Sequence, residues 1–94
     1  MIEPSHTAKA TVVIQNQLGL HARPAMTFVD AANGFASAVR VSKGSQSVDG
    51  KSIMQMMMLA ATQGTQLQIE AEGSDAREAV ETLLVLVESK FGEE

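Results

Sequence analysis

The sequence predicts an α+β fold in which three helices cover one face of a largely antiparallel sheet. In three segments the apolar residues recur with the period of a helix, whereas four other segments are short and either β-branched or alternating. Turn-forming residues separate the segments, and their order is βαββαβα. The chain has 94 residues, 45% of them apolar, which suits one small domain. We expect residues 9–94 to form this domain and residues 1–8 to form a polar N-terminal tail.

The first strand and the first helix are expected on either side of a glycine-containing loop. Residues 9–15 (KATVVIQ) are β-branched and lead into the turn-prone sequence NQLG, which predicts a strand. From residue 22 to residue 32 the apolar residues recur at helical spacing, and Asn33-Gly34 supplies a C-terminal stop. The predicted helix therefore begins immediately after His21.

A hairpin and a second helix are expected in the middle of the chain. Residues 35–42 and 46–49 are predicted to be antiparallel strands on either side of a short glycine-containing turn. Residues 52–61 are predicted to form the helix. Ser52 and Gln55 fit a capping box, with serine at the N-cap and glutamine three residues later.

The last third of the chain predicts a strand and a long helix. Residues 66–72 (QLQIEAE) alternate strictly between apolar and polar side chains, as in a strand with one buried face. Asp75 and Glu78 fit a second capping box. The apolar residues from 76 to 87 then follow helical spacing, and Phe91 is expected near the end of this helix.

Composition excludes several classes of protein. Without cysteine, the chain cannot form disulfides, a cysteine-ligated zinc site or a thiol nucleophile. Its longest apolar run, residues 56–61, is far shorter than the roughly 18 residues that a membrane span needs. The net charge of −4 and the lack of a Lys/Arg cluster disfavour nucleic acid as a partner. The N-terminus does not have the layout of a signal peptide, so a cytoplasmic location is expected.

Of the two histidines, His21 is the candidate for chemistry. His6 is expected to be solvated in the polar tail, whereas His21 precedes the first helix in the sequence GLHARPA. If His21 is the N-cap, the amides of Ala22 and Arg23 point out of the helix end. These amides and the Arg23 guanidinium favour an anion there. An imidazole at this place can attack a phosphoryl group that the same donors would then hold.

The residues alone leave other interpretations of His21 open. A histidine before a proline at a helix start is often only a surface cap. Metal binding is a further possibility, although the sequence supplies no clustered second ligand, and no metal site is predicted. Acid–base chemistry is another, although no neighbouring carboxylate can be assigned.

The second helix is unusually rich in methionine. A helical wheel places Met56, Leu59 and Ala60 on one arc, which suffices for the core. The remaining apolar residues lie on another arc: Ile53, Met54, Met57, Met58 and Ala61. A two-layer domain of this size cannot easily bury both arcs, so part of the second is expected to be exposed. Unbranched thioether side chains repack readily, which suits docking to several partners.

The sequence GLHARPA resembles the active-site signature of HPr, the histidine-containing phosphocarrier family of the bacterial sugar phosphotransferase system, and of its nitrogen-branch relatives. Two further segments support the resemblance: KSIM at residues 51–54 resembles the second signature of the family, and TQGT at 62–65 resembles the turn after the second helix. The likeness covers the whole chain. It implies an open-faced β-sandwich whose four antiparallel strands have the order 1-4-2-3.

The resemblance also implies a function. His21 would be phosphorylated on Nδ1 by enzyme I, which takes the group from phosphoenolpyruvate, and would pass it to an enzyme II A-type domain. Ala22 and Arg23 would hold the phosphoryl group. The protein would need no cofactor, act as a monomer and not turn over alone. A second hypothesis is a regulatory binding module whose phosphorylation state selects its partners, and a third is a small domain of unrelated function.

Two further sites follow from the resemblance. Ser52 falls on the serine that HPr kinase/phosphorylase modifies in many bacteria, although it also suits a plain helix cap. Ile53, Met54 and Met57 fall on the surface that docks enzyme I and the A-type domains. The family commonly has glycine in place of Gln55 and a small polar residue in place of Met58, so recognition by such a kinase stays open.

Overall fold

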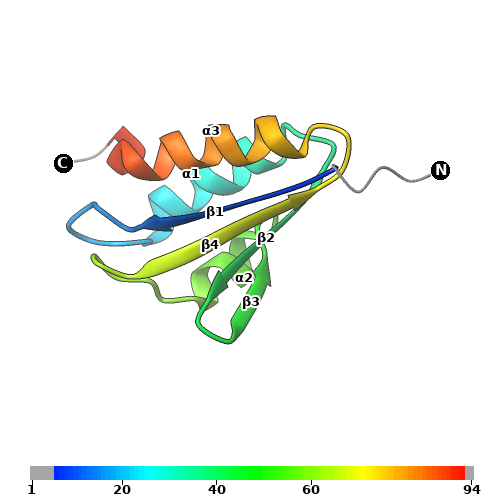
Figure 1. Ribbon diagram of the computed structural model, residues 1–94. Coiled ribbons are helices and arrows are strands. Elements are labelled where there is room, and N and C mark those ends of the chain that lie inside the picture. Colours follow the sequence, from blue (N-terminus) through cyan, green and yellow to red (C-terminus); the bar gives the residue numbers. More distant parts are fainter. Residues whose placement is uncertain (1–5, 93–94) are drawn as a thin grey trace.

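The structure is a computed structural model that describes residues 6–92. Four strands form one antiparallel sheet in the order β1-β4-β2-β3, and the helices lie on one of its faces, as Figure 1 shows. The elements are β1 (Thr7–Val13), α1 (Ala22–Ala32), β2 (Ala38–Lys43), β3 (Gln46–Asp49), α2 (Ile53–Met58), β4 (Gln66–Glu72) and α3 (Ala76–Glu88), followed by a 3₁₀ turn at Lys90–Gly92. The predicted fold class, element order and strand order are confirmed.

The core lies between the sheet and the helices. Alternation puts Leu67, Ile69 and Ala71 of β4 on the buried face, as the sequence pattern predicts. The largest fully buried apolar side chains come from all parts of the fold: Ile14, Phe28, Val41, Met56, Leu59, Leu67, Ile69, Leu83 and Val87. Burial of these side chains is the main force that holds a chain without disulfides together.

The other face of the sheet is polar. Across the strands Lys9 pairs with Glu70, Glu70 with Arg40 and Arg40 with Asp49. Opposite charges thus alternate across all four strands, which stabilises their register on a face that no helix covers.

The first two predicted strand boundaries shift because of tertiary contacts. β1 begins at Thr7 rather than at residue 9, since the last two residues of the predicted tail pair with β4; residues 1–5 of that tail lie outside the described residues. β1 also ends at Val13 rather than at residue 15. Beyond it, the Ile14 amide donates to the Thr65 carbonyl 2.9 Å away, in the loop before β4. β2 begins at Ala38 rather than at residue 35, because Asp75 holds the segment before it.

The second helix is shorter than the predicted 52–61. Two side chains of the β2–β3 hairpin take the carbonyls at its end: Lys43 Nζ donates to Leu59 O at 2.6 Å and Gln46 Nε2 donates to Met58 O at 3.2 Å. The chain then turns through a left-handed residue, Ala60, with φ of 49°. Because the helix has ended, the wheel no longer applies: Ala60 is exposed and Ala61 is buried, the reverse of the prediction.

Asp75 does not form the predicted capping box with Glu78. Its side chain caps no amide of α3. Instead one carboxylate oxygen accepts from the Ser37 hydroxyl at 2.5 Å and from the Ser37 amide at 2.9 Å, and the other accepts from the Ala36 amide at 2.9 Å. The Ser37 hydroxyl, followed by the Ala36 amide, lowers the pKa of the Asp75 carboxyl. Asp75 therefore ties the start of α3 to the segment that leads into β2.

This tie predicts an acid-sensitive contribution to stability. The pKa of Asp75 lies below its ordinary value of 3.8, so its contribution is present above that value and is lost as pH falls through the lower, folded value. In urea titrations, the difference in unfolding free energy between wild type and Asp75→Asn should shrink below about pH 4. Glu78→Gln removes a carboxylate from the same turn without touching Ser37 and is the matched control. A difference for Asp75→Asn that is constant with pH would contradict the assignment.

Candidate functional site

The loop before α1 is held against the segment that follows α2. Gly19 has a φ of +69°, and a Cβ there would lie 2.6 Å from the Ala61 carbonyl oxygen, so only glycine fits. The next amide, of Leu20, donates to that same oxygen at 2.8 Å. Within the loop, the side chain of the buried Asn16 donates to the Gly19 carbonyl at 2.6 Å. These contacts fix the loop immediately before His21.

His21 is the N-cap of α1, as predicted. Its backbone is extended, with φ of −83° and ψ of −170°, and its carbonyl accepts from the Ala25 amide at 3.0 Å. Its imidazole is partly exposed and makes no cap hydrogen bond to the helix. The main chain thus starts the helix, and the ring is not needed for capping.

The end of α1 next to His21 suits an anion. The amides of Ala22 and Arg23 have no partner within the helix at these positions, and Pro24 has no amide hydrogen. The first turn contains no acidic residue that could compete for them. Both Ala22 and Arg23 are exposed, whereas Pro24 is buried against the core. A helix of 11 residues carries about half a positive charge at this end, so a dianion attached to His21 would be stabilised.

Exposed apolar side chains lie on α2, which packs against α1. On α2, Met56 is buried, while Ile53, Met54, Met57 and Met58 are exposed, in agreement with the two predicted arcs except at Ala60 and Ala61. Leu18 and Met26 are also exposed, one in the loop before His21 and one on α1. Neither residue was predicted from the sequence to belong to the site. Met26 is next to the buried Ala25 and lies outside the buried side of α1. This position on the helix is the sequence signal that could have indicated its exposure.

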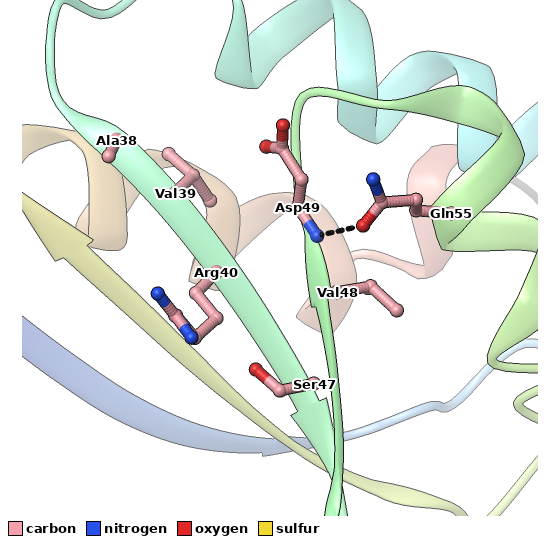
Figure 2. Close-up of a pocket in the computed structure, with 7 residues that line it drawn as sticks. All are labelled: Ala38, Val39, Arg40, Ser47, Val48, Asp49 and Gln55. Atoms are coloured by element: carbon pink, nitrogen blue, oxygen red, sulfur yellow. Dashed lines mark hydrogen bonds between the residues drawn. The ribbon is translucent and has the colours of Figure 1, made fainter.

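Ser52 is the N-cap of α2, and only half of its predicted capping box forms. The Ser52 hydroxyl accepts from the Gln55 amide at 3.2 Å. The Gln55 carboxamide does not return to Ser52; its Oε1 accepts from the Asp49 amide at 2.9 Å, which Figure 2 shows. There Gln55 lines a shallow hollow beside β2 and β3, with Ala38, Val39, Arg40, Ser47, Val48 and Asp49. Gln55 thus braces the connection that presents Ser52.

His21 and Ser52 lie at opposite ends of α1. Lys51, next to Ser52, is tied to the C-terminal end of that helix: its carbonyl accepts from Asn33 Nδ2 at 3.3 Å and its Nζ donates to the Phe35 carbonyl at 2.7 Å. His21 is at the N-terminal end, and 11 residues span about 16 Å. A modification at Ser52 would therefore act on the surface between them, not by contact with His21.

The structure offers no sign of a metal centre or a membrane segment in residues 6–92. No three His, Cys, Asp or Glu side chains in this range are placed to hold a metal ion. No helix in the same range is long and apolar enough to cross a membrane.

Known proteins resemble the chain over nearly all of its length. Residues 8–89 match the family described as the PTS HPr component phosphorylation site. The chain is 46% identical over 85 residues to the phosphocarrier protein HPr of Neisseria meningitidis serogroup A, and the match covers 90% of this chain and 96% of that protein. It is 41% identical over 85 residues to the phosphocarrier protein NPr of Proteus mirabilis, and this match covers 88% of this chain and 93% of that protein.

A solved structure agrees with these relatives. HPr-C-His from Thermoanaerobacter tengcongensis has a TM-score of 0.89 and 47% sequence identity, and the match covers 93% of this chain and 98% of that one. The similarity therefore extends beyond the sequence around His21 to the fold that holds it.

Proposed function

The chain belongs to the HPr family of phosphocarrier proteins of the phosphotransferase system, and on this premise we propose that His21 is the residue that carries the phosphoryl group. As a member of that family it is a carrier and not by itself an enzyme. The observation that supports His21 most strongly is its position at the N-cap of α1, beside two amides without helical partners and one arginine.

The proposed chemistry needs only these residues. A ring nitrogen of His21, Nδ1 in this proposal, attacks the phosphorus atom carried by enzyme I. The new N–P bond forms as the bond between phosphorus and the donor breaks. The negative charge of the transferred group then faces the amides of Ala22 and Arg23 and the Arg23 guanidinium. Transfer to an enzyme II A-type domain repeats the same exchange with His21 as the leaving group.

The proposed partners dock on the exposed apolar surface beside His21. Ile53, Met54 and Met57 form its α2 part, and Leu18 and Met26 extend it on the side of the histidine. Flexible thioether side chains suit a surface that fits an enzyme I and several A-type domains in turn. We also propose that the protein acts as a monomer in the cytoplasm.

A phosphotransfer assay tests the proposal. The protein is incubated with phosphoenolpyruvate and enzyme I, and intact-mass measurement is expected to show the gain of one acid-labile phosphoryl group. Addition of an A-type domain should then remove it. If no group is gained, the carrier role of His21 is refuted.

Arg23→Ala should slow transfer without abolishing it. The Ala22 and Arg23 amides remain in this variant, whereas the guanidinium that faces the phosphoryl group is lost. Removal of one preorganised donor typically costs on the order of 100-fold in rate, and less where solvent reaches the site, as it does at the exposed Arg23. Rapid-quench measurement of phosphoryl transfer from enzyme I gives the rate, and Arg77→Ala on α3 is the control for net charge. A wild-type rate would show that Arg23 is only a surface charge.

Regulation at Ser52 is a separate part of the proposal. A kinase would have to reach a hydroxyl that already accepts from the Gln55 amide, beside a Gln55 carboxamide bonded to Asp49. A phosphate on Ser52 would add about two negative charges beside the apolar docking surface. The similarity to an NPr protein supports the alternative of a regulatory module, in which the phosphorylation state selects the partner.

Ser52→Asp tests this regulation. The aspartate can still accept from the Gln55 amide as an N-cap, so the melting temperature is expected to stay within a few degrees of wild type. The added charge beside the docking surface should raise the KM of enzyme I for this carrier. Ser52→Asn, a neutral cap, is the control. An unchanged KM would make Ser52 a helix cap only.

A further inference from the structure

Methionine is the most oxidisable side chain of this protein, and its methionines differ sharply in exposure. The sequence contains no cysteine, tryptophan or tyrosine, so oxidants meet thioethers first. Met54 is 77% exposed and Met58 67% exposed, whereas Met56, between them in sequence, is 0% exposed. Susceptibility to oxidation follows exposure, so the structure places reactive and protected sulfurs in one short helix.

The geometry of α2 keeps the two exposed sulfurs together and outward. Met54 and Met58 are four residues apart, so they are neighbours on one side of the helix. Met56 and Leu59, both fully buried, anchor the opposite side. The bonds from Lys43 and Gln46 hold the final carbonyls of the helix, and the Gln55 bond to Asp49 braces its start. The helix therefore cannot roll to hide the pair without breaking these contacts.

We propose that Met54 and Met58 form a site of reversible oxidation by hydrogen peroxide that switches partner docking off. Each thioether sulfur loses two electrons to the peroxide, whose O–O bond breaks. One oxygen forms the S=O bond of the sulfoxide and the other leaves as water. Met54 belongs to the proposed docking surface and Met58 is its neighbour on the helix, so polar sulfoxides there would remove apolar contacts that a partner would cover. The effect on docking, though not the oxidation itself, rests on the proposed function.

The chemical part is tested by oxidation mapping. The full chain is treated with hydrogen peroxide under native conditions, and the sulfoxide content of peptides is followed by mass spectrometry. Met54 and Met58 should oxidise at least about tenfold faster than Met56, with Met26 and Met57 between them. In denaturant all sites should react alike. Equal native rates at Met54, Met56 and Met58 would overturn the proposal.

The functional part is tested by transfer from enzyme I to untreated and oxidised protein. Oxidation should raise the KM about tenfold or more, leave kcat and the melting temperature nearly unchanged, and be reversed by methionine sulfoxide reductases of both stereospecificities. The double variant Met54→Leu/Met58→Leu is the control, and each protein is compared with its own untreated sample. At a peroxide exposure that oxidises Met54 and Met58 of the wild type but not Met26 and Met57, the effect should vanish in this variant. A persisting effect, or none in wild type, would overturn the switch.

The two proposals fail in different ways. Untreated protein that accepts no phosphoryl group would refute the carrier role of His21 while leaving the oxidation map unaffected. Untreated protein that is active, with full activity after oxidation at Met54 and Met58, would refute the switch alone.

Discussion

His21→Ala should fold as the wild type does and accept no phosphoryl group. The side chain makes no cap hydrogen bond, and the main-chain bond from the Ala25 amide to residue 21 does not need the ring. The cost in stability should therefore stay within about 1 kcal/mol, the usual scale for loss of an N-cap side chain. The variant lacks the imidazole that we propose as the attachment site of the phosphoryl group, so transfer should fall below detection.

His6→Ala is the matched control for this experiment. His6 is exposed just before β1, and its carbonyl accepts from the Gly73 amide at 2.8 Å, a main-chain bond that the alanine keeps. Loss of its imidazole should therefore leave the phosphotransfer rate unchanged. Intact-mass measurement after incubation with phosphoenolpyruvate and enzyme I, together with thermal melts, reads out both variants. Acid-labile phosphorylation that persists in His21→Ala would move the acceptor to another residue.

Met56→Glu should unfold the protein or bring it close to unfolding. Met56 is fully buried, and a glutamate there would place a carboxylate in the apolar core without a partner of opposite charge. The expected loss is several kcal/mol, against a total stability of about 5–15 kcal/mol for a typical domain. Leu59→Glu, on the same buried side of α2, should behave alike.

Met54→Glu is the matched control, two residues away on the exposed side. It should leave the melting temperature within a few degrees of wild type and should instead raise the KM of enzyme I. Urea denaturation of the two variants distinguishes these outcomes. If Met54→Glu unfolded the domain and Met56→Glu did not, the two faces of α2 would be assigned the wrong way round.

The order of the elements could be predicted from local patterns, but several of their ends could not. Helical period and strand alternation are properties of neighbouring residues. The start of β2, however, depends on Asp75, some 38 residues further along the chain. The end of α2 depends on Lys43 and Gln46, which reach it from the hairpin. Contacts of this kind become visible only when the chain is folded.

The site likewise has features that the local sequence predicts and features that depend on distant parts of the chain. The N-cap role of His21 and the exposed amides of α1 follow from the local sequence. Phosphoryl transfer was one of several chemistries that the residues left open at His21, and the resemblance of GLHARPA to a known signature singled it out. Leu18 and Met26 were missed because an apolar residue in a loop or helix is first interpreted as core. Only half of the capping box predicted at Ser52 forms, because the Gln55 side chain accepts from the Asp49 amide of β3 instead.

The position of β4 in the sheet has a consequence for how the protein is made. Among the residues that the structure describes, β4 is the only strand paired with β1, and it also pairs with β2. While a ribosome is still synthesising residues 66–72, β1 has no strand to pair with and the four-stranded sheet cannot form. Contacts between such distant segments form slowly, and domains that mix helices and sheet fold at rates between those of helical bundles and those of all-β domains. The loop before His21 is bonded to the segment between α2 and β4, through the Leu20 amide and the Ala61 carbonyl. This loop is therefore expected to take its final shape late in the folding of a nascent chain.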